Sequence, residues 1–313
     1  MMEYLDKLKK EINKVIAGKE QQAELLAISL LFNGHILLES VPGTGKTMLA
    51  KSFAQSINGK FSRIQFTPDV LPSDVTGIQF FNPKKQEFEF HQGPIVANIV
   101  LADEINRATP RTQSSLLEVM EERQVTIDGH TISLSTPFMV IATQNPFESQ
   151  QGTFPLPVAQ LDRFFMKLAI DYPSLAEERT MLKMYKTGTA SVKVNAVLTA
   201  DEIDKLKETA GKVGMNEPVE SYLLELVRKT REHADIELGV SPRGTLALMK
   251  ASQGKAFLEG RNYVVPNDIK FMVPYVLGHR IFLSTEASMT KTPESVLQDV
   301  LESVPVPVES GAF

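Results

Sequence analysis

Five short apolar runs, separated by longer amphipathic stretches, dominate the pattern of hydrophobic and polar positions. Helical periodicity covers the start of the chain to about Phe32, and Gly34 ends it before the first apolar run. Each run has the length of a strand, and together they occupy residues 35–39, 61–66, 98–102, 138–143 and 166–170. Because strands that alternate with helices form parallel units, the pattern predicts an α/β fold: a five-stranded parallel sheet with helices on both faces.

Two other segments alternate apolar and polar residues around a turn signal. Residues 77–91 do so around Asn82-Pro83, and residues 123–134 do so around Asp128-Gly129. An Asp-Gly dipeptide between alternating residues is typical of a tight two-residue turn. We therefore expect two β-hairpins inserted into the sheet domain.

The last part of the chain has helical periodicity, and no strand is expected after Asp171. Ser174 with Glu177, and Thr199 with Glu202, have the spacing of a capping box at a helix start. A second, helical domain is expected to begin between residues 186 and 199. The predicted division is residues 1–190 for the sheet domain and residues 191–313 for the helical domain.

Composition narrows the class of protein. The chain has 313 residues, no cysteine and a net charge of −5. Disulfides, thiolate metal sites and a cysteine nucleophile are therefore excluded, and a diffuse basic surface for nucleic acid is absent. The N-terminus lacks the apolar core of a signal peptide, and residues 25–38 are too short to span a membrane. We expect a soluble, cytoplasmic protein.

A phosphate-binding loop follows the first predicted strand. The segment SVPGTGKT, residues 40–47, precedes a helical stretch at residues 48–57. Its glycines let backbone N–H groups point toward a phosphate, while Lys46 reaches the outer phosphates and Thr47 offers a hydroxyl to Mg²⁺. Ser40 stands where the usual pattern has its first glycine, which leaves the backbone conformation there open.

Two other predicted strands end in polar residues. The third strand is followed by Asp103 and Glu104, and the fourth leads to Asn145-Pro146. An Asp at this edge of the sheet can hold Mg²⁺, the adjacent Glu can activate a water, and an Asn amide can bind a phosphate. Taken alone, each signal has a plainer interpretation: a solvated pair before a helix, and a turn.

A catalytic arginine is expected near the terminal phosphate, either within the chain or from a neighbouring subunit. Arg163, in LDRF, and Arg243, in SPRG, are the candidates by context. Three other arginines compete with them, namely Arg107, Arg111 and Arg123. An arginine beside an aspartate is also common in surface ion pairs.

The order of these segments resembles the AAA+ ATPases and, within them, the MoxR family. The segments are ESVPGTGKT, IVLADEINRATPRTQSSLLEVMEE, VIATQNP, LPVAQLDRF and SPRG. The resemblance extends from residues 15–18 to residues 301–305. It implies an AAA+ P-loop NTPase core with two inserted hairpins, followed by a helical lid, and the hydrolysis of ATP held between the two.

The resemblance also implies roles for individual residues. It implies that nucleotide is bound by Ile16, Ala17, Gly18, Val41, Pro42, Gly43, Thr44, Gly45, Lys46, Thr47, Met48 and Arg243. It implies catalytic roles for Lys46, Asp103, Glu104, Asn145, Arg163 and Arg243, with Thr47 and Asp103 holding Mg²⁺. In this assignment Asn145 is sensor 1, Arg163 acts on the nucleotide of the neighbouring subunit, and Arg243 is sensor 2 on the lid.

At the level of assembly, the resemblance implies a ring, usually a hexamer, with both hairpins facing the central pore. It further implies a chaperone that matures or activates protein complexes, with a von Willebrand factor A domain protein as partner. Two alternatives stay open. One is an AAA+ motor on nucleic acid, for which the first hairpin supplies aromatics with few cations. The other is a slow nucleotide-gated switch, motivated by Ser40.

Overall fold

The computed structural model describes residues 2–41, 43–145, 152–186 and 193–307. A five-stranded sheet forms its centre, and every neighbouring pair of strands is parallel. In order across the sheet, the strands are β2 (Phe61–Gln65), β5 (Ile99–Asp103), β8 (Met139–Gln144), β1 (Ile36–Ser40) and β9 (Met166–Ile170). The predicted sheet is confirmed, and each strand lies within one residue of its predicted bounds.

Helices cover both faces of the sheet. Since neighbouring strand residues point to opposite faces, Leu38 packs into one hydrophobic core and Leu37 into the other. The first core includes residues of α1 (Met2–Asn13), α2 (Glu20–Leu31) and α3 (Lys46–Ser56). The second core includes residues of α4 (Pro72–Thr76), the short helix η1 (Ile105–Arg107) and α5 (Pro110–Glu122).

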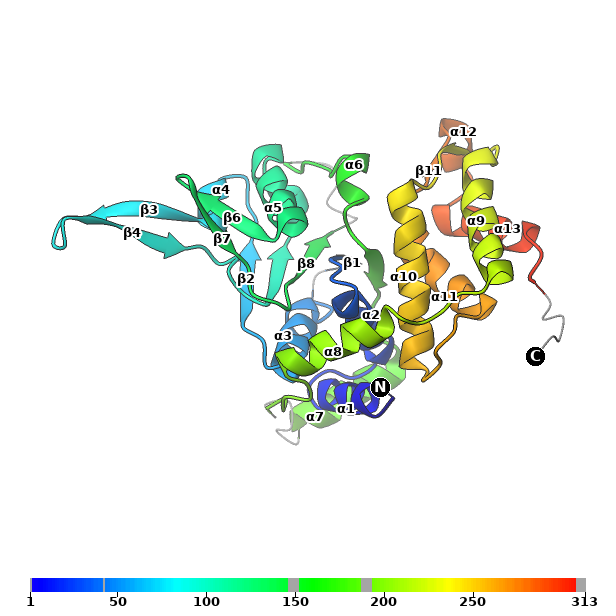
Figure 1. Cartoon of the computed structure of the whole chain (residues 1–313), viewed down its shortest axis with the longest axis horizontal. Helices are drawn as coiled ribbons and strands as arrows, with labels where there is room; N and C mark the ends of the chain where they lie inside the picture. The colour runs from blue at the N-terminus through cyan, green and yellow to red at the C-terminus, as the bar shows by residue number, and fades with distance from the viewer. Residues whose placement is uncertain (1, 42, 146–151, 187–192, 308–313) are drawn as a thin grey trace.

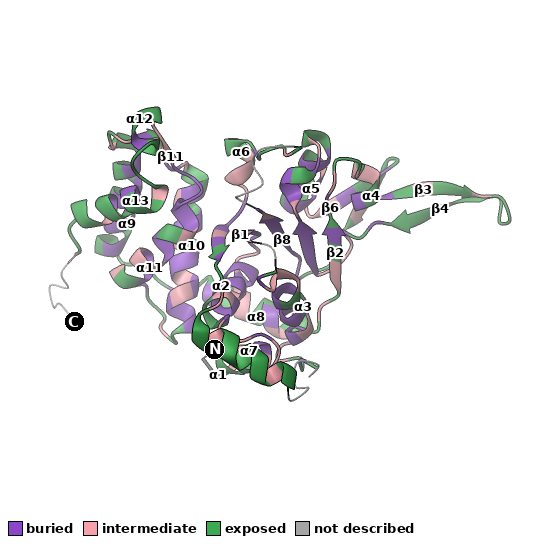
Figure 2. Cartoon of the chain, turned by 180° about the vertical axis from the view of Figure 1, so that it is seen from behind, coloured by how far each residue is buried: buried purple, intermediate pink, exposed green. Residues whose placement is uncertain are grey.

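Both predicted hairpins are present. The first pairs β3 (Gly77–Asn82) with β4 (Glu87–Gln92), and the second pairs β6 (Gln124–Ile127) with β7 (His130–Ser133). Asp128 and Gly129 both have positive φ, as a tight two-residue hairpin turn requires. Hairpin β3–β4 projects far from the body of the protein (Figure 1), and Figure 2 shows most of it exposed.

Helices dominate the chain after β9, as predicted. The one-turn helix α6 (Val158–Leu161) lies just before β9. The later helices are α7 (Leu175–Lys186), α8 (Ala200–Ala210), α9 (Glu217–Glu232), α10 (Pro242–Leu258), α11 (Pro266–Leu277), α12 (Thr285–Ser288) and α13 (Pro293–Ser303). Reciprocal hydrogen bonds form both predicted capping boxes, Ser174 with Glu177 and Thr199 with Glu202.

The prediction that no strand follows Asp171 is wrong. Strands β10 (Ile236–Leu238) and β11 (Phe282–Leu283) pair as a small antiparallel sheet among the C-terminal helices. Segments of three and two residues are too short to show an alternating pattern, so periodicity alone does not detect them.

Helices α9 to α13 lie beyond the β9 edge of the sheet, where α11 contacts β9, on the side opposite hairpin β3–β4 (Figure 1). Residues of α8 to α11 belong to the same hydrophobic core as α1 and α2. The predicted boundary between residues 190 and 191 lies outside the described residues. Within the described residues, none of the helices is long and apolar enough to cross a membrane.

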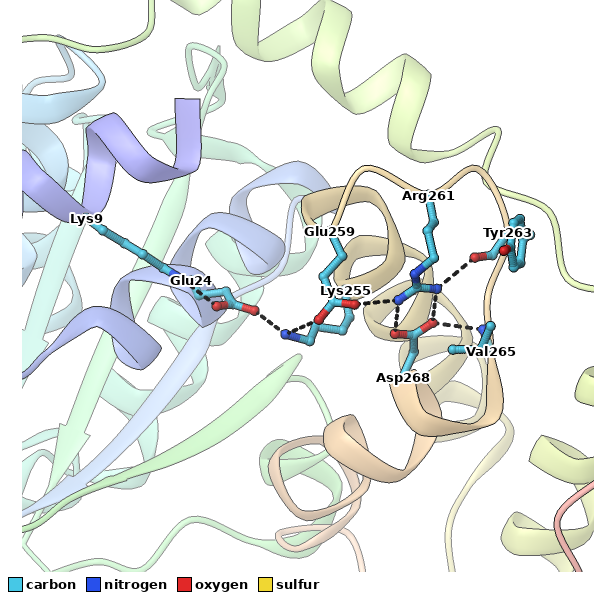
Figure 3. A network of polar contacts seen from close by, with 8 residues as sticks. All are labelled: Lys9, Glu24, Lys255, Glu259, Arg261, Tyr263, Val265 and Asp268. Carbon is cyan, nitrogen blue, oxygen red and sulfur yellow. Dashed lines mark hydrogen bonds and ion pairs between the residues drawn. The ribbon is translucent and has the colours of Figure 1, made fainter. Parts of the chain in front are cut away.

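A chain of charged side chains also joins the two parts (Figure 3). Glu24 of α2 is 8% exposed and bonds to Lys9 of α1 at 2.8 Å and to Lys255 of α10 at 2.7 Å. Lys255 pairs in turn with Glu259, and Glu259 with Arg261. A buried carboxylate is stable only when its charge is matched, so this network ties the first helices to the C-terminal ones.

Candidate functional site

The loop between β1 and α3 has the backbone conformation that a phosphate-binding loop needs. Gly43 and Gly45 have φ of +83° and +87°, in the left-handed region that side chains disfavour. A Cβ on Gly45 would also lie 2.7 Å from Cδ1 of Ile16. The Thr44 hydroxyl donates to the Val41 carbonyl at 3.0 Å and closes the loop. Pro42, also predicted to bind nucleotide, lies outside the described residues.

Ser40 does not adopt the left-handed backbone conformation. It is the last residue of β1, has strand geometry and pairs with Ile170 of β9. Its side chain is 3% exposed. The position that usually carries glycine therefore adopts an extended conformation here, which any residue can take.

Asp103 lies at the end of β5, 4% exposed, and is surrounded by donors. The Thr143 hydroxyl donates to Oδ1 at 2.6 Å, Arg63 Nη2 lies 2.7 Å from Oδ2, and Lys46 Nζ lies 3.6 Å from Oδ1. Burial acts to raise the pKa of Asp103, but these hydrogen bonds and positive charges outweigh it and hold the pKa below its usual value. Asp103 is therefore ionised at neutral pH.

Glu104 is held beside it by the backbone and by two side chains. Its φ is +58°, and its amide donates to the Thr143 hydroxyl at 2.9 Å. Gln65 donates to the carboxylate at 3.0 Å and Arg107 at 3.2 Å. One hydroxyl, that of Thr143, therefore holds both members of the predicted carboxylate pair.

A cavity of about 830 Å³ brings these groups together. Of the predicted residues, it is lined by Gly43, Gly45, Lys46, Thr47, Met48, Asp103 and Glu104. Six further residues line it that the sequence analysis missed, namely Val15, Lys51, Ser52, Gln55, Arg63 and Lys193. No motif marks these positions. Val15 alone could have been predicted, because it directly precedes Ile16, Ala17 and Gly18, which were predicted to bind nucleotide.

Residues 16–18, predicted to bind nucleotide, are not among the residues that line that cavity. Val15 lines it, whereas Ile16 is buried against Gly45 and Gly18 packs against Glu177 of α7. Ala17 lies between them. Asn145 follows the end of β8, is 7% exposed and is not among the residues that line this cavity.

Arg163 and Arg243 line a different cavity, of about 490 Å³, together with Glu121. Arg243, predicted to bind nucleotide as sensor 2 on the lid, lines this cavity and not that of the phosphate loop. From the predicted lid, residues 191–313, the phosphate-loop cavity includes Lys193. The C-terminal helices pack on the β9 edge, so the Ser241–Gly244 turn meets the turn that carries Arg163 rather than the phosphate loop. Of the competing arginines, Arg107 pairs with Glu104 and Arg123 bonds to the Asn33 carbonyl, while Arg111 is exposed.

The donor set of the first cavity suits Mg²⁺. Thr47 and Asp103 both line it and both offer oxygen, the ligand atom that this ion prefers. Among the residues described, no group of three or more His, Cys, Asp or Glu side chains could hold a metal by itself. Mg²⁺ needs no such group, since it usually keeps several waters and binds one or two protein oxygens together with substrate phosphates.

Comparisons with known proteins agree with this geometry. A family model described as "ATPase family associated with various cellular activities (AAA)" matches residues 35–166, and one described as "AAA lid domain" matches residues 228–300. A parallel sheet with a phosphate loop, a carboxylate pair at a strand end and a helical lid define the class: this is a nucleotide-binding AAA+ ATPase.

Individual relatives narrow the class. The chain is 48% identical over 309 residues to the uncharacterized protein YeaC of Bacillus subtilis, covering 98% of this chain and 96% of that protein. It is 40% identical over 307 residues to Chaperone MoxR1 of Mycobacterium tuberculosis, covering 95% and 81%. A solved structure of an ATPase candidate from Cytophaga hutchinsonii matches with a TM-score of 0.90 and 37% identity, covering 98% and 96%. The chain belongs to the MoxR family of AAA+ ATPases.

Proposed function

We propose that this chain hydrolyses ATP to ADP and phosphate in a reaction that requires Mg²⁺. The observation that carries the proposal is the convergence of Lys46, Asp103 and Glu104 on the cavity that the phosphate loop lines. Lys46 lies 3.6 Å from Asp103, so a strong positive and a strong negative group meet where the outer phosphates and their metal would bind.

Each side chain then has one task. The backbone N–H groups of the loop and Lys46 bind the phosphates, and Thr47 and Asp103 hold Mg²⁺. The ion, when bound, neutralises charge that develops on the transferred phosphoryl group. Glu104 orients the attacking water and accepts its proton, and Asn145 hydrogen-bonds the terminal phosphate or that water.

The catalytic arginine comes from a neighbouring copy in this proposal. Arg163 lies in a different cavity from the phosphate loop of its own chain, and its side chain is 34% exposed. A homo-hexameric ring would place it against the nucleotide of the next subunit. Residues 1–190 form the nucleotide-binding part of each subunit in this scheme, and residues 191–313 form the lid.

The biological role we propose is that of a chaperone that matures, assembles or activates protein complexes. Relatives named Chaperone MoxR1 and Protein MoxR support it, as does the exposed aromatic hairpin. Four phenylalanines there are more than 40% exposed, namely Phe80, Phe81, Phe88 and Phe90. An exposed apolar surface of this kind is typical of contact with another protein. We propose that the partner contains a von Willebrand factor A domain.

Nucleic acid fits this hairpin less well. Lys85, one of its few cations, is paired with Glu89 at 2.7 Å, and Glu87 lies on the same strand as Glu89. A track for single-stranded nucleic acid needs unpaired positive charge beside its aromatics. Stimulation of ATP hydrolysis by DNA at moderate salt would favour the motor over the chaperone.

The test is ATP hydrolysis measured against protein concentration, with particle mass recorded by light scattering in the same samples. Specific activity should rise with assembly. Glu104→Gln should lower kcat by about 10²-fold or more, and Arg163→Ala by about 10³-fold, while both variants keep ATP binding. Arg111→Ala, a change at an exposed arginine, is the matched control and should keep wild-type activity. Activity that is absent from the assembled wild type would leave the slow switch as the better description.

A further inference from the structure

One carboxylate joins the two arginines of the second cavity. Glu121, at the end of α5, places Oε2 3.2 Å from Nε of Arg163, and its Oε1 accepts from Nη2 of Arg243. The three side chains come from three separate elements: α5, the turn after α6, and the first turn of α10. Glu121 therefore links the sheet part of the chain to the lid at the place where the arginines emerge.

A second layer of bonds beneath this carboxylate holds the same two turns together. Asp162, next to Arg163, accepts from the Ser241 hydroxyl at 2.8 Å and from Nε of Arg280 at 2.8 Å. Ser241 also caps α10 by accepting from the Gly244 amide at 3.1 Å. The backbones that carry Arg163 and Arg243 are thus fixed relative to each other, and only the ends of the two side chains need further positioning.

The cavity around Glu121 carries an excess of positive charge, and its two arginine side chains are partly exposed. The cavity is lined by five cationic side chains, namely Arg123, Arg163, Arg243, Lys250 and Arg280, against the two acidic side chains Glu121 and Asp162. The side chains of Arg163 and Arg243 are 34% and 47% exposed. Two guanidinium groups that share one carboxylate keep an excess positive charge, which an incoming phosphate can match.

We propose that Glu121 is the positioning residue that holds Arg163 and Arg243 as a single two-arginine group for the nucleotide of a neighbouring copy. The inference rests on the proposed shared site and adds a residue that does not itself touch the nucleotide. Without Glu121, two long side chains of like charge repel each other and sample many conformations. Positioned donors stabilise a transition state more than mobile ones because less reorganisation is needed.

The test uses rings assembled from two variants. In a shared site one subunit supplies the phosphate loop and its neighbour supplies the arginines, so two variants can restore activity only if they are defective on different sides. Glu121→Gln keeps the shape of the side chain and removes its charge. We expect the assembled variant to lose about tenfold or more in kcat, with ATP affinity within about twofold of wild type. Glu122→Gln, at the next and exposed residue of α5, is the matched control and should keep wild-type kcat.

Glu121→Gln mixed with Glu104→Gln should regain activity, since the first supplies an intact phosphate site and the second intact arginines. With random 1:1 mixing, about one quarter of the interfaces are competent. Glu121→Gln mixed with Arg163→Ala should regain nothing, because both lack the same side of the site. Glu121→Gln added to Arg163→Ala/Arg243→Ala should lower kcat by less than about twofold, since its partners are already absent.

Three results would overturn the inference even if the shared site is correct. They are a wild-type kcat for assembled Glu121→Gln, rescue between Glu121→Gln and Arg163→Ala, and a full additional loss in the double-arginine background. If Arg163→Ala and Glu104→Gln do not rescue each other, the shared site itself is wrong and the inference falls with it. If Glu121→Gln does not assemble, Glu121→Asp, which keeps the charge but is too short to reach both arginines, takes its place with the same expected outcomes.

Discussion

Removal of one hydroxyl should disturb both carboxylates of the nucleotide site. Thr143 is fully buried; its Oγ1 donates to Asp103 at 2.6 Å and accepts from the Glu104 amide at 2.9 Å. Thr143→Val keeps the shape and leaves both partners without this bond. A hydrogen bond to a charged group contributes about 1.5–3 kcal/mol and an unpaired buried amide costs about 1–3 kcal/mol, so we expect a loss of about 2–4 kcal/mol in the free energy of unfolding.

Urea denaturation measures this loss, and ATP hydrolysis measures its effect on the site. We expect kcat to fall about ten- to hundredfold, because Glu104 is no longer held in its turn. Thr126→Val makes the same chemical change on the exposed hairpin β6–β7, where Thr126 bonds only to Thr131 among the described residues, and should change stability by less than about 0.5 kcal/mol.

The pH dependence gives an independent check. The folded-state pKa of Asp103 lies below its usual value, so its bonds stabilise the protein above about pH 3.9 and lose this effect as the pH falls toward the folded pKa. The stability difference between wild type and Thr143→Val should therefore be larger at pH 7 than at pH 3.5. Equal stability of the two proteins at pH 7, or a difference that does not shrink in acid, would refute this account of the site.

Three further predictions concern the phosphate-binding loop, the buried His35 and the contact between the sheet part and the C-terminal helices. Gly45→Ala should abolish ATP binding in a fluorescent-nucleotide titration and should destabilise the protein more than Gly43→Ala. The reason is that a Cβ at Gly45 meets Ile16, whereas a Cβ at Gly43 meets nothing within 4 Å. Equal stability of the two variants would contradict this explanation. Burial lowers the pKa of His35 to about 4, so the unfolded state binds its proton first and stability falls as the pH drops from about 6.5. At pH 5 His35 should account for a loss of about 2 kcal/mol, so His35→Gln should reduce the fall in stability measured by urea denaturation by about that amount. Lys255→Met leaves buried Glu24 with Lys9 as its remaining charge partner among the described residues. The free energy of unfolding should fall by about 1–3 kcal/mol. An unchanged midpoint in urea denaturation would show that this network adds no stability.

Local signals predicted much of the architecture. The apolar runs placed all five parallel strands to within one residue, and Asp128-Gly129 placed the second hairpin turn. The capping boxes at Ser174 and Thr199 form as their spacing indicates. These features depend on neighbours within a few residues, so the sequence carries the whole signal.

The composition of the site was only partly predictable. The residues of the phosphate loop and the carboxylate pair line one cavity, as their order along the chain indicated. Arg63 shows what was missed: it bonds to Asp103, 40 residues away, because β2 lies next to β5 in the sheet. Nothing in the segment around Arg63 marks it, and a surface lysine or arginine on a strand is usually without function.

The sequence by itself therefore determined which chemistry this protein carries: a loop that turns N–H groups toward phosphates, with a lysine, a threonine and two carboxylates at strand ends. The tertiary structure decided which of its arginines meet and where. Arg163, Arg243 and Glu121 are brought together only because the C-terminal helices pack on the β9 edge of the sheet, away from the phosphate loop. Contacts between residues 42 to 122 positions apart are set by how whole elements pack, and no local pattern encodes that packing.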